Sequence, residues 1–174
     1  MAHPLGRPML GLMIALCLAS PAPAVAAAVC DGLTAGRPQS YRSLRFGVSM
    51  THPSSITIVP GSLTENGDTV RFKSADARVL VTITMMPNTR DETVTELYRE
   101  AEQDVIQNSR GMIDFVRRGE GWFIMQGEMV GRIYYRRTVL LQRPRAIGTL
   151  WIEYPRELRA CMEEIIPMMS RSFG

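Results

Sequence analysis

The feature that most constrains the fold of this chain is a set of four segments in its C-terminal half. Apolar and polar residues alternate within each segment, and very short breaks join them. The runs span residues 113–117, 122–129, 133–142 and 146–154. The breaks between them are Gly119-Glu120-Gly121, Val130-Gly131 and Arg143-Pro144-Arg145. Breaks this short connect antiparallel neighbours, because a parallel connection needs a crossover of roughly a dozen residues or more. The sequence therefore predicts a meander of antiparallel strands.

The N-terminal half adds strands of its own. Residues 45–50 and 56–59 are predicted to form a first hairpin, joined through His52-Pro53-Ser54-Ser55. Apolar and polar residues also alternate at residues 69–74, which predicts a further strand. The clearest strand is predicted at residues 78–86, where one face is fully apolar and about half of the other face is apolar. The apolar face consists of Val79, Val81, Ile83 and Met85. Such a strand suits a sheet that is covered by helices on one side and more open on the other.

Two amphipathic segments predict the main helices. Overlapping capping boxes, Thr89-x-x-Glu92 and Thr93-x-x-Glu96, introduce a helix over residues 92–108. A closing helix starts after Pro155, and its apolar stripe is Leu158, Cys161, Met162, Ile165, Met169 and Phe173. We therefore expect an α+β fold, a mainly antiparallel sheet of about six to eight strands packed with two main helices as an α/β/α sandwich.

The first 26 residues have the three-part order of a secretory signal. Arg7 precedes eleven apolar residues, Met9 to Ala19, which are too few for a membrane span of about 20. The segment ends in Ala24-Val25-Ala26, so we expect cleavage after Ala26, with Ala24 and Ala28 as alternative sites. This leaves one domain, residues 27–174, in the periplasm or secreted. Large residues precede both Cys17 and Cys30, so no lipid anchor is expected.

Removal of this leader leaves two of the three cysteines. Cys30 and Cys161 would then lie in an oxidising compartment, where disulfides form and persist, and we expect them to pair. The alternative is that Cys161 is a buried thiol on the apolar face of its helix, with Cys30 free near the new N-terminus.

The layout resembles a known fold. The early stretch "FGVSMTHPSSITI", a first helix after a strongly apolar strand, a late meander and a last helix ending in Ser172-Phe173 are similar to the PsbP family of photosystem II extrinsic proteins and to a Ran-binding nuclear import factor. The resemblance covers nearly all of residues 27–174. It implies an accessory or binding role by analogy, and no functional residue carries over from it.

No catalytic or metal-binding constellation is found in the sequence. After cleavage His52 is the only histidine, and none of its serine neighbours, Ser49, Ser54 and Ser55, lies in a nucleophile-elbow motif. One histidine and two paired cysteines are too few for zinc, and the methionines occupy apolar positions that indicate core packing. The carboxylates Asp114, Glu120, Glu128 and Glu153 could converge, which the sequence leaves open. We therefore expect no cofactor and no enzymatic activity.

The clearest candidate binding surface lies on one predicted strand. Arg132, Tyr134 and Arg136 share a face there, and both residue types are enriched in binding hot spots. The alternative is a solvent-facing strand whose long side chains cover apolar surface. Only Lys73 among the 20 basic residues is a lysine, which indicates codon bias in a GC-rich genome. The high arginine count is therefore weak evidence for a polyanion partner, and we expect no nucleic acid to bind. The leading hypothesis is an exported, non-enzymatic module that binds another envelope protein, and the alternative is a periplasmic protein that binds a small ligand or metal.

Overall fold

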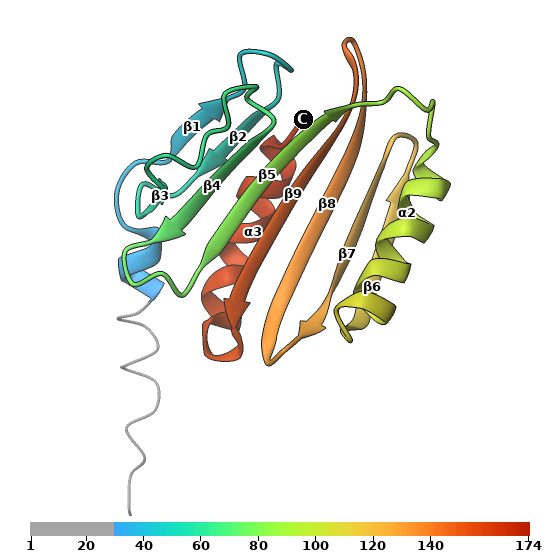
Figure 1. Ribbon diagram of the computed structural model, residues 1–174. Coiled ribbons are helices and arrows are strands. Elements are labelled where there is room, and N and C mark those ends of the chain that lie inside the picture. The colour runs from blue at the N-terminus through green and yellow to red at the C-terminus, as the bar shows by residue number, and fades with distance from the viewer. Residues whose placement is uncertain (1–29) are drawn as a thin grey trace, which may run out of the picture.

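A computed structural model describes residues 30–174 of the chain (Figure 1). The predicted leader and its cleavage site lie outside these residues, as does Cys17. The strands are β1 (Gln39–Arg42), β2 (Ser49–His52), β3 (Ile56–Ile58), β4 (Thr69–Ser74), β5 (Leu80–Pro87), β6 (Met112–Gly119), β7 (Trp122–Met129), β8 (Arg132–Gln142) and β9 (Arg145–Pro155). The longer helices are α2 (Val94–Gln103), which continues into the π-helical segment η1 (Asp104–Asn108), and α3 (Arg159–Ser172), which follows the 3-10 turn η2 (Arg156–Leu158).

Seven strands form one antiparallel sheet in the order β3-β4-β5-β9-β8-β7-β6. The predicted meander is confirmed, because β6 to β9 are consecutive neighbours joined by tight turns. β9, the last strand of the meander, then pairs with β5 and lies in the middle of the sheet. This pairing joins the N-terminal strands to the C-terminal meander. The fold class is therefore α+β, as the strand and helix patterns predicted.

One face of the sheet carries the larger core. Helix α3 lies against it (Figure 1), and the predicted apolar stripe from Leu158 to Phe173 is buried there. The apolar face of β5 packs into the same cluster. A separate two-stranded ribbon, β1-β2, covers the β4 end of this face, where Tyr41 and His52 pack around the Phe72 ring with centroids 5.5 Å and 5.1 Å apart.

The pairing of the first strands differs from the prediction. The segment from His52 to Ser55 was expected to turn a hairpin between residues 45–50 and 56–59, and this is wrong. Instead β2 pairs with β1, and β3 pairs with β4. Alternation sets the type of each strand but says nothing about its partner, which depends here on burial of Met50 and Ile56 in one core.

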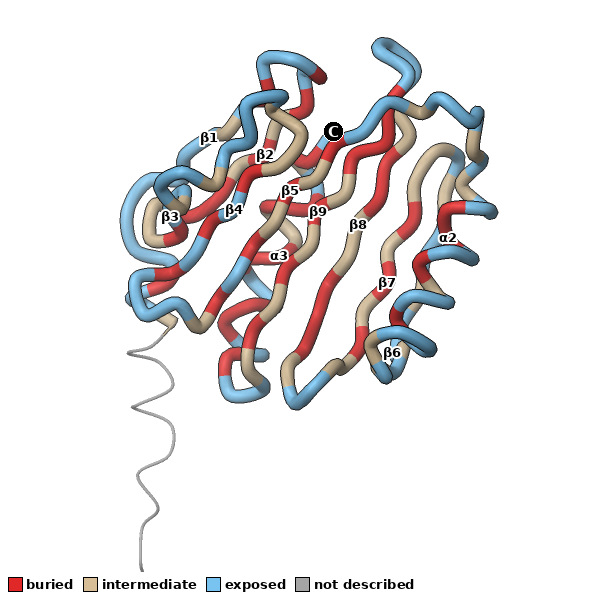
Figure 2. Tube along the Cα trace, viewed as in Figure 1, coloured by how far each residue is buried: buried red, intermediate tan, exposed pale blue. Residues whose placement is uncertain are grey.

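Helix α2 covers only half of the opposite face. Its buried residues Leu97, Tyr98 and Ala101 pack on the strands β6, β7 and β8, and Figure 2 shows its outward side exposed. The helix was expected from residue 92 and begins two residues later, at Val94. Of the two predicted capping boxes, the second caps it, and there Thr93 and Glu96 bond reciprocally. Across residues 30–174, no helix is long and apolar enough to span a membrane.

Candidate functional site

The half of the sheet that α2 leaves uncovered presents polar side chains on three neighbouring strands, β4, β5 and β9. We call it the open face and define it by residues that alternate away from the α3 core: Thr69, Arg71 and Lys73 of β4, Leu80, Thr82 and Thr84 of β5, and Thr149, Trp151 and Glu153 of β9. None of these side chains is fully buried, and Figure 2 shows the alternation of buried and exposed positions along β4.

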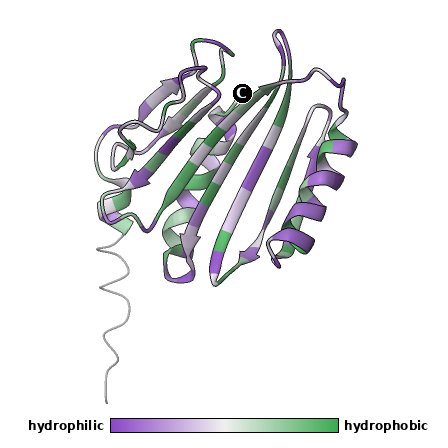
Figure 3. Cartoon of the chain, viewed as in Figure 1, coloured by the Kyte–Doolittle hydropathy of each residue, from purple (hydrophilic) through white to green (hydrophobic). Residues whose placement is uncertain are grey.

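Strand register aligns these residues in three rows across the sheet. The rows continue onto β8, and they read Thr69-Thr84-Thr149-Thr138, Arg71-Thr82-Trp151-Arg136 and Lys73-Leu80-Glu153-Tyr134. Residues in one row lie side by side, about 5 Å apart from strand to strand. The rows therefore present a threonine ladder next to a row with arginine at both ends, and Figure 3 shows hydrophilic residues recurring along β4 and β8.

The predicted surface residues Arg132, Tyr134 and Arg136 do share this side of the sheet, but they are not equally accessible. Tyr134 is fully buried, because its ring lies flat against Trp151 with centroids 5.0 Å and planes 3° apart. Its hydroxyl donates to the carbonyl oxygen of Met112 at 3.1 Å. Burial raises the pKa of Tyr134 to about 12. Tyr134 therefore supports the surface from beneath and does not contact a partner itself.

The two arginines have different surroundings. Arg132 is tied down, since it donates to the carbonyl oxygens of Arg78 at 2.6 Å and Glu153 at 3.2 Å, and its Nε lies 3.6 Å from the Glu153 carboxylate. Arg136 donates through Nε to the hydroxyl of Thr138 at 3.1 Å and sits over the Phe123 ring. Among the described residues no carboxylate lies within 4.0 Å of Arg136.

Sequence reasoning missed the largest part of the surface. Arg71, Lys73 and Trp151 come from strands on either side of β5, and only the order of strands in the sheet brings them together. Alternation indicated that Arg71 and Lys73 point away from the apolar side of β4, yet nothing in the sequence placed Trp151 beside them. Arg71 and Lys73 are exposed, whereas Trp151 is half-buried and donates through its indole nitrogen to Glu153 at 2.6 Å.

The other candidate residues do not assemble into a reactive site. His52 is buried beside Phe72, and the nearby hydroxyls of Ser49, Ser54 and Ser55 each donate to a backbone carbonyl instead of to the imidazole. Glu128 and Glu153 lie on opposite faces of the sheet, and each pairs with arginine. Within residues 30–174, no group of three or more His, Cys, Asp or Glu side chains is placed to hold a metal.

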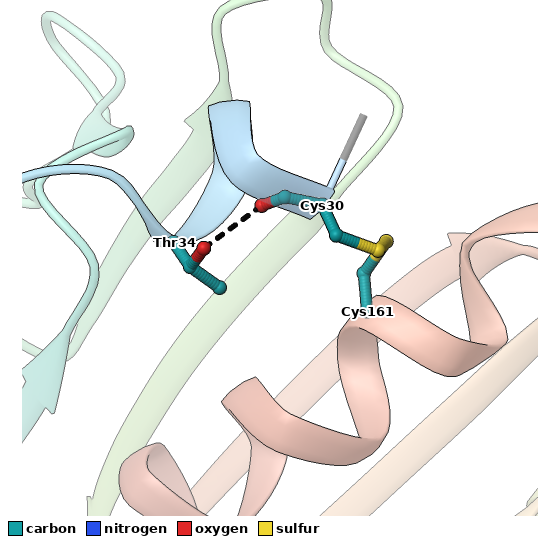
Figure 4. The surroundings of a disulfide bond; sticks show 3 residues. All are labelled: Cys30, Thr34 and Cys161. Carbon is teal, nitrogen blue, oxygen red and sulfur yellow. Dashed lines mark hydrogen bonds between the residues drawn. A yellow bond between two sulfur atoms is a disulfide. The ribbon is translucent and has the colours of Figure 1, made fainter. Parts of the chain in front are cut away.

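A disulfide joins Cys30 to Cys161 (Figure 4), and their Cα atoms are 5.0 Å apart. Cys30 begins the described part of the chain, where residues 30–34 are helical and Thr34 donates to the Cys30 carbonyl oxygen at 3.0 Å. Cys161 is buried on the apolar side of α3. The predicted pair is therefore formed, and the alternative of a free Cys30 is not found.

Comparison with known proteins gives a fold and no family. Searches with family models and against curated proteins found no match to the sequence. Among solved structures, the Saccharomyces cerevisiae Ran-binding protein Mog1p is similar with a TM-score of 0.61 and 7% identity, over 80% of this chain and 96% of that one. The cyanobacterial PsbP (CyanoP) from Synechocystis sp. PCC 6803 gives a TM-score of 0.59 at 14% identity, over 82% and 95%. At these identities the likeness establishes the fold alone, and the chain has the fold shared by Mog1p and PsbP.

Proposed function

We propose that this protein is an exported, non-enzymatic accessory module that binds another envelope protein through the open face. One observation carries the proposal: Arg71, Lys73 and Trp151 lie on a part of the sheet that no described element covers. Arginine and tryptophan are enriched among residues that dominate binding energy. The charge of the face favours a partner with an acidic surface, because the two exposed cations Arg71 and Lys73 outnumber the single carboxylate of Glu153.

Two further observations support the proposal. The solved structure of Mog1p, a Ran-binding protein, has this fold, which makes a protein partner a reasonable expectation by analogy. The sequence pattern of the first 26 residues supports export, and a disulfide between Cys30 and Cys161 suits an oxidising compartment.

Charge reversal on the open face tests the proposal. The double variant Arg71→Glu, Lys73→Glu should no longer recover the partner by cross-linking and affinity capture from the native envelope, while its melting temperature stays within a degree or two, since both side chains are exposed. The matched control is Arg42→Glu, Arg171→Glu, which makes the same charge change at exposed positions on β1 and α3.

The partner identified in this way should then bind the purified wild-type protein directly, with an affinity that falls as salt is raised. Equal recovery by wild type and the Arg71, Lys73 variant would remove the open face from consideration. Loss of the partner with the control variant alone would move the contact to the α3 side.

A further inference from the structure

A cavity of about 480 Å³ lies where the open face meets α2. This volume falls in the range of roughly 300–1,000 Å³ that small-molecule sites occupy. The residues that line it come from β5, β8, β9, the segment before α2, and α2 with η1; those used below are Met86, Leu97, Glu100, Asp104, Arg136 and Ile147. The cavity therefore has a floor of sheet and a wall of helix.

The floor carries a cation with unused donors. Arg136 is half-buried and donates only from Nε, to Thr138, so that in the described chain its two terminal nitrogens have no hydrogen-bond acceptor. Burial lowers the pKa of Arg136, while the charges of Asp104 and Glu100 act in the opposite direction. The guanidinium stays protonated at neutral pH, since an arginine pKa starts above 12. An anionic group in the cavity would satisfy these donors.

The helical wall carries the opposite charge. Glu100 and Asp104 are four positions apart on α2 and η1, so they lie on the same side of the helix. Asp104 accepts from the side-chain amide of Asn108 at 3.0 Å, whereas Glu100 has no hydrogen-bond or ion-pair partner in the part of the chain that the structure describes. The helix changes from α to π geometry at Asp104, a local irregularity that is frequent at functional sites.

The charges of wall and floor are separated. Within residues 30–174, no carboxylate oxygen of Glu100 or Asp104 lies within 4.0 Å of the Arg136 guanidinium. All three side chains line the cavity, so the opposite charges face the same space without forming an ion pair. Leu97 and Ile147 are buried beside this gap, and Met86 adds an exposed apolar side chain at its margin. A ligand that fits must therefore carry both charges close together and an apolar group.

We propose that this cavity binds a small apolar α-amino acid as its zwitterion. The ligand carboxylate accepts hydrogen bonds from the terminal nitrogens of Arg136, and the ligand ammonium donates to Glu100 and Asp104. The side chain packs on Leu97, Ile147 and Met86. This function is separate from protein binding at the open face, because it uses Arg136 and α2 and requires neither Arg71 nor Lys73.

Titration calorimetry of the purified protein with L-leucine as the probe tests the proposal. We expect one leucine per chain, with the amide signals of α2 and β8 shifting in parallel by NMR. Isocaproate, which lacks the ammonium, and isoamylamine, which lacks the carboxylate, should each bind at least about tenfold more weakly, since each forfeits a charged hydrogen bond. Binding of either analogue as tightly as leucine, or no saturable binding at millimolar leucine, would overturn the zwitterion site.

Three variants assign the roles. Arg136→Met should weaken leucine at least about tenfold and leave isoamylamine unchanged, and Glu100→Gln should weaken leucine and leave isocaproate unchanged. Arg71→Met, on the same row of the sheet but outside the cavity, should bind leucine as wild type does. If Arg136→Met fails to fold, Arg136→Lys, which keeps the charge without the bidentate geometry, gives the same test with a smaller loss. Unchanged leucine affinity in both Arg136 variants would contradict the proposal.

Discussion

Cys30 is covalently joined to Cys161 across 131 positions of sequence, so the bond fastens the start of the described chain to the buried side of the last helix. The bond therefore spans most of the described residues. Cys161 is buried against the main core, whereas Cys30 is only partly covered and packs at its edge.

Loss of the disulfide should destabilise the protein strongly. In the chain-entropy account, opening a loop of this length costs about 5 kcal/mol, less any strain that the native bond carries. The double variant Cys30→Ala, Cys161→Ala should show a fall in the free energy of unfolding of this order in urea titration. Reducing agent should lower the stability of the wild type by the same amount and leave the double variant unaffected. Insensitivity of the wild type to reductant would show that the bond contributes no stability.

Charge reversal at Arg132 should cost stability, unlike charge reversal at Arg71. Arg132 donates to two backbone carbonyl oxygens, so Arg132→Glu would remove these hydrogen bonds and bring a second carboxylate beside Glu153. We expect a loss of about 2–3 kcal/mol. Arg71→Glu, on the exposed surface, should change stability by less than about 0.5 kcal/mol. Urea unfolding measures both, and equal effects would show that the Arg132 hydrogen bonds contribute nothing.

The turn between β7 and β8 should be improved by a single substitution. Val130 has φ of 49° and is 89% exposed, so a β-branched residue adopts a left-handed conformation with no compensating burial. Val130→Asn should stabilise the protein by roughly 1 kcal/mol, because asparagine tolerates this left-handed conformation. Asn-Gly is also the preferred pair for a two-residue hairpin turn such as the one formed by residues 130 and 131. Val130→Thr keeps the branch and should bring no gain in thermal unfolding. A gain of equal size with threonine would mean that polarity, and not backbone strain, explains the effect.

High pH should unfold the protein through its buried tyrosines. Burial raises the pKa of Tyr134 and of Tyr154 to about 12 each, above the ordinary value of 10.0. The neutral phenols therefore stabilise the fold fully below pH 10, and this contribution is lost as pH rises toward 12. Burial also raises the pKa of Tyr41, Tyr98 and Tyr135. Tyrosinate absorbance should therefore rise above pH 10, with Tyr134 and Tyr154 titrating last and together with loss of circular dichroism. Titration of all tyrosines near pH 10 in a folded protein would contradict the assignment.

The local patterns determined most of the elements. Alternation and turn residues predicted the strand boundaries of β7 to β9. The spacing of Thr93 and Glu96 predicted the capping box, and helical spacing predicted the buried stripe of α3. All of these signals depend only on neighbours in the chain. The disulfide could also be predicted, because only two cysteines remain if the leader is removed. The pairing of β1 with β2 could not, since register and partner depend on contacts between distant segments.

The candidate sites belong almost wholly to the tertiary structure. The sequence by itself indicated that Arg132, Tyr134 and Arg136 share a side of one strand, and this holds. Packing decided which of them is accessible. Trp151 stacks on Tyr134, which is buried, while Arg136 and residues of α2 line the same cavity. Alternation predicts the side of the sheet to which each side chain points. It does not predict whether a helix packs over that side chain, because the position of each helix depends on contacts throughout the core.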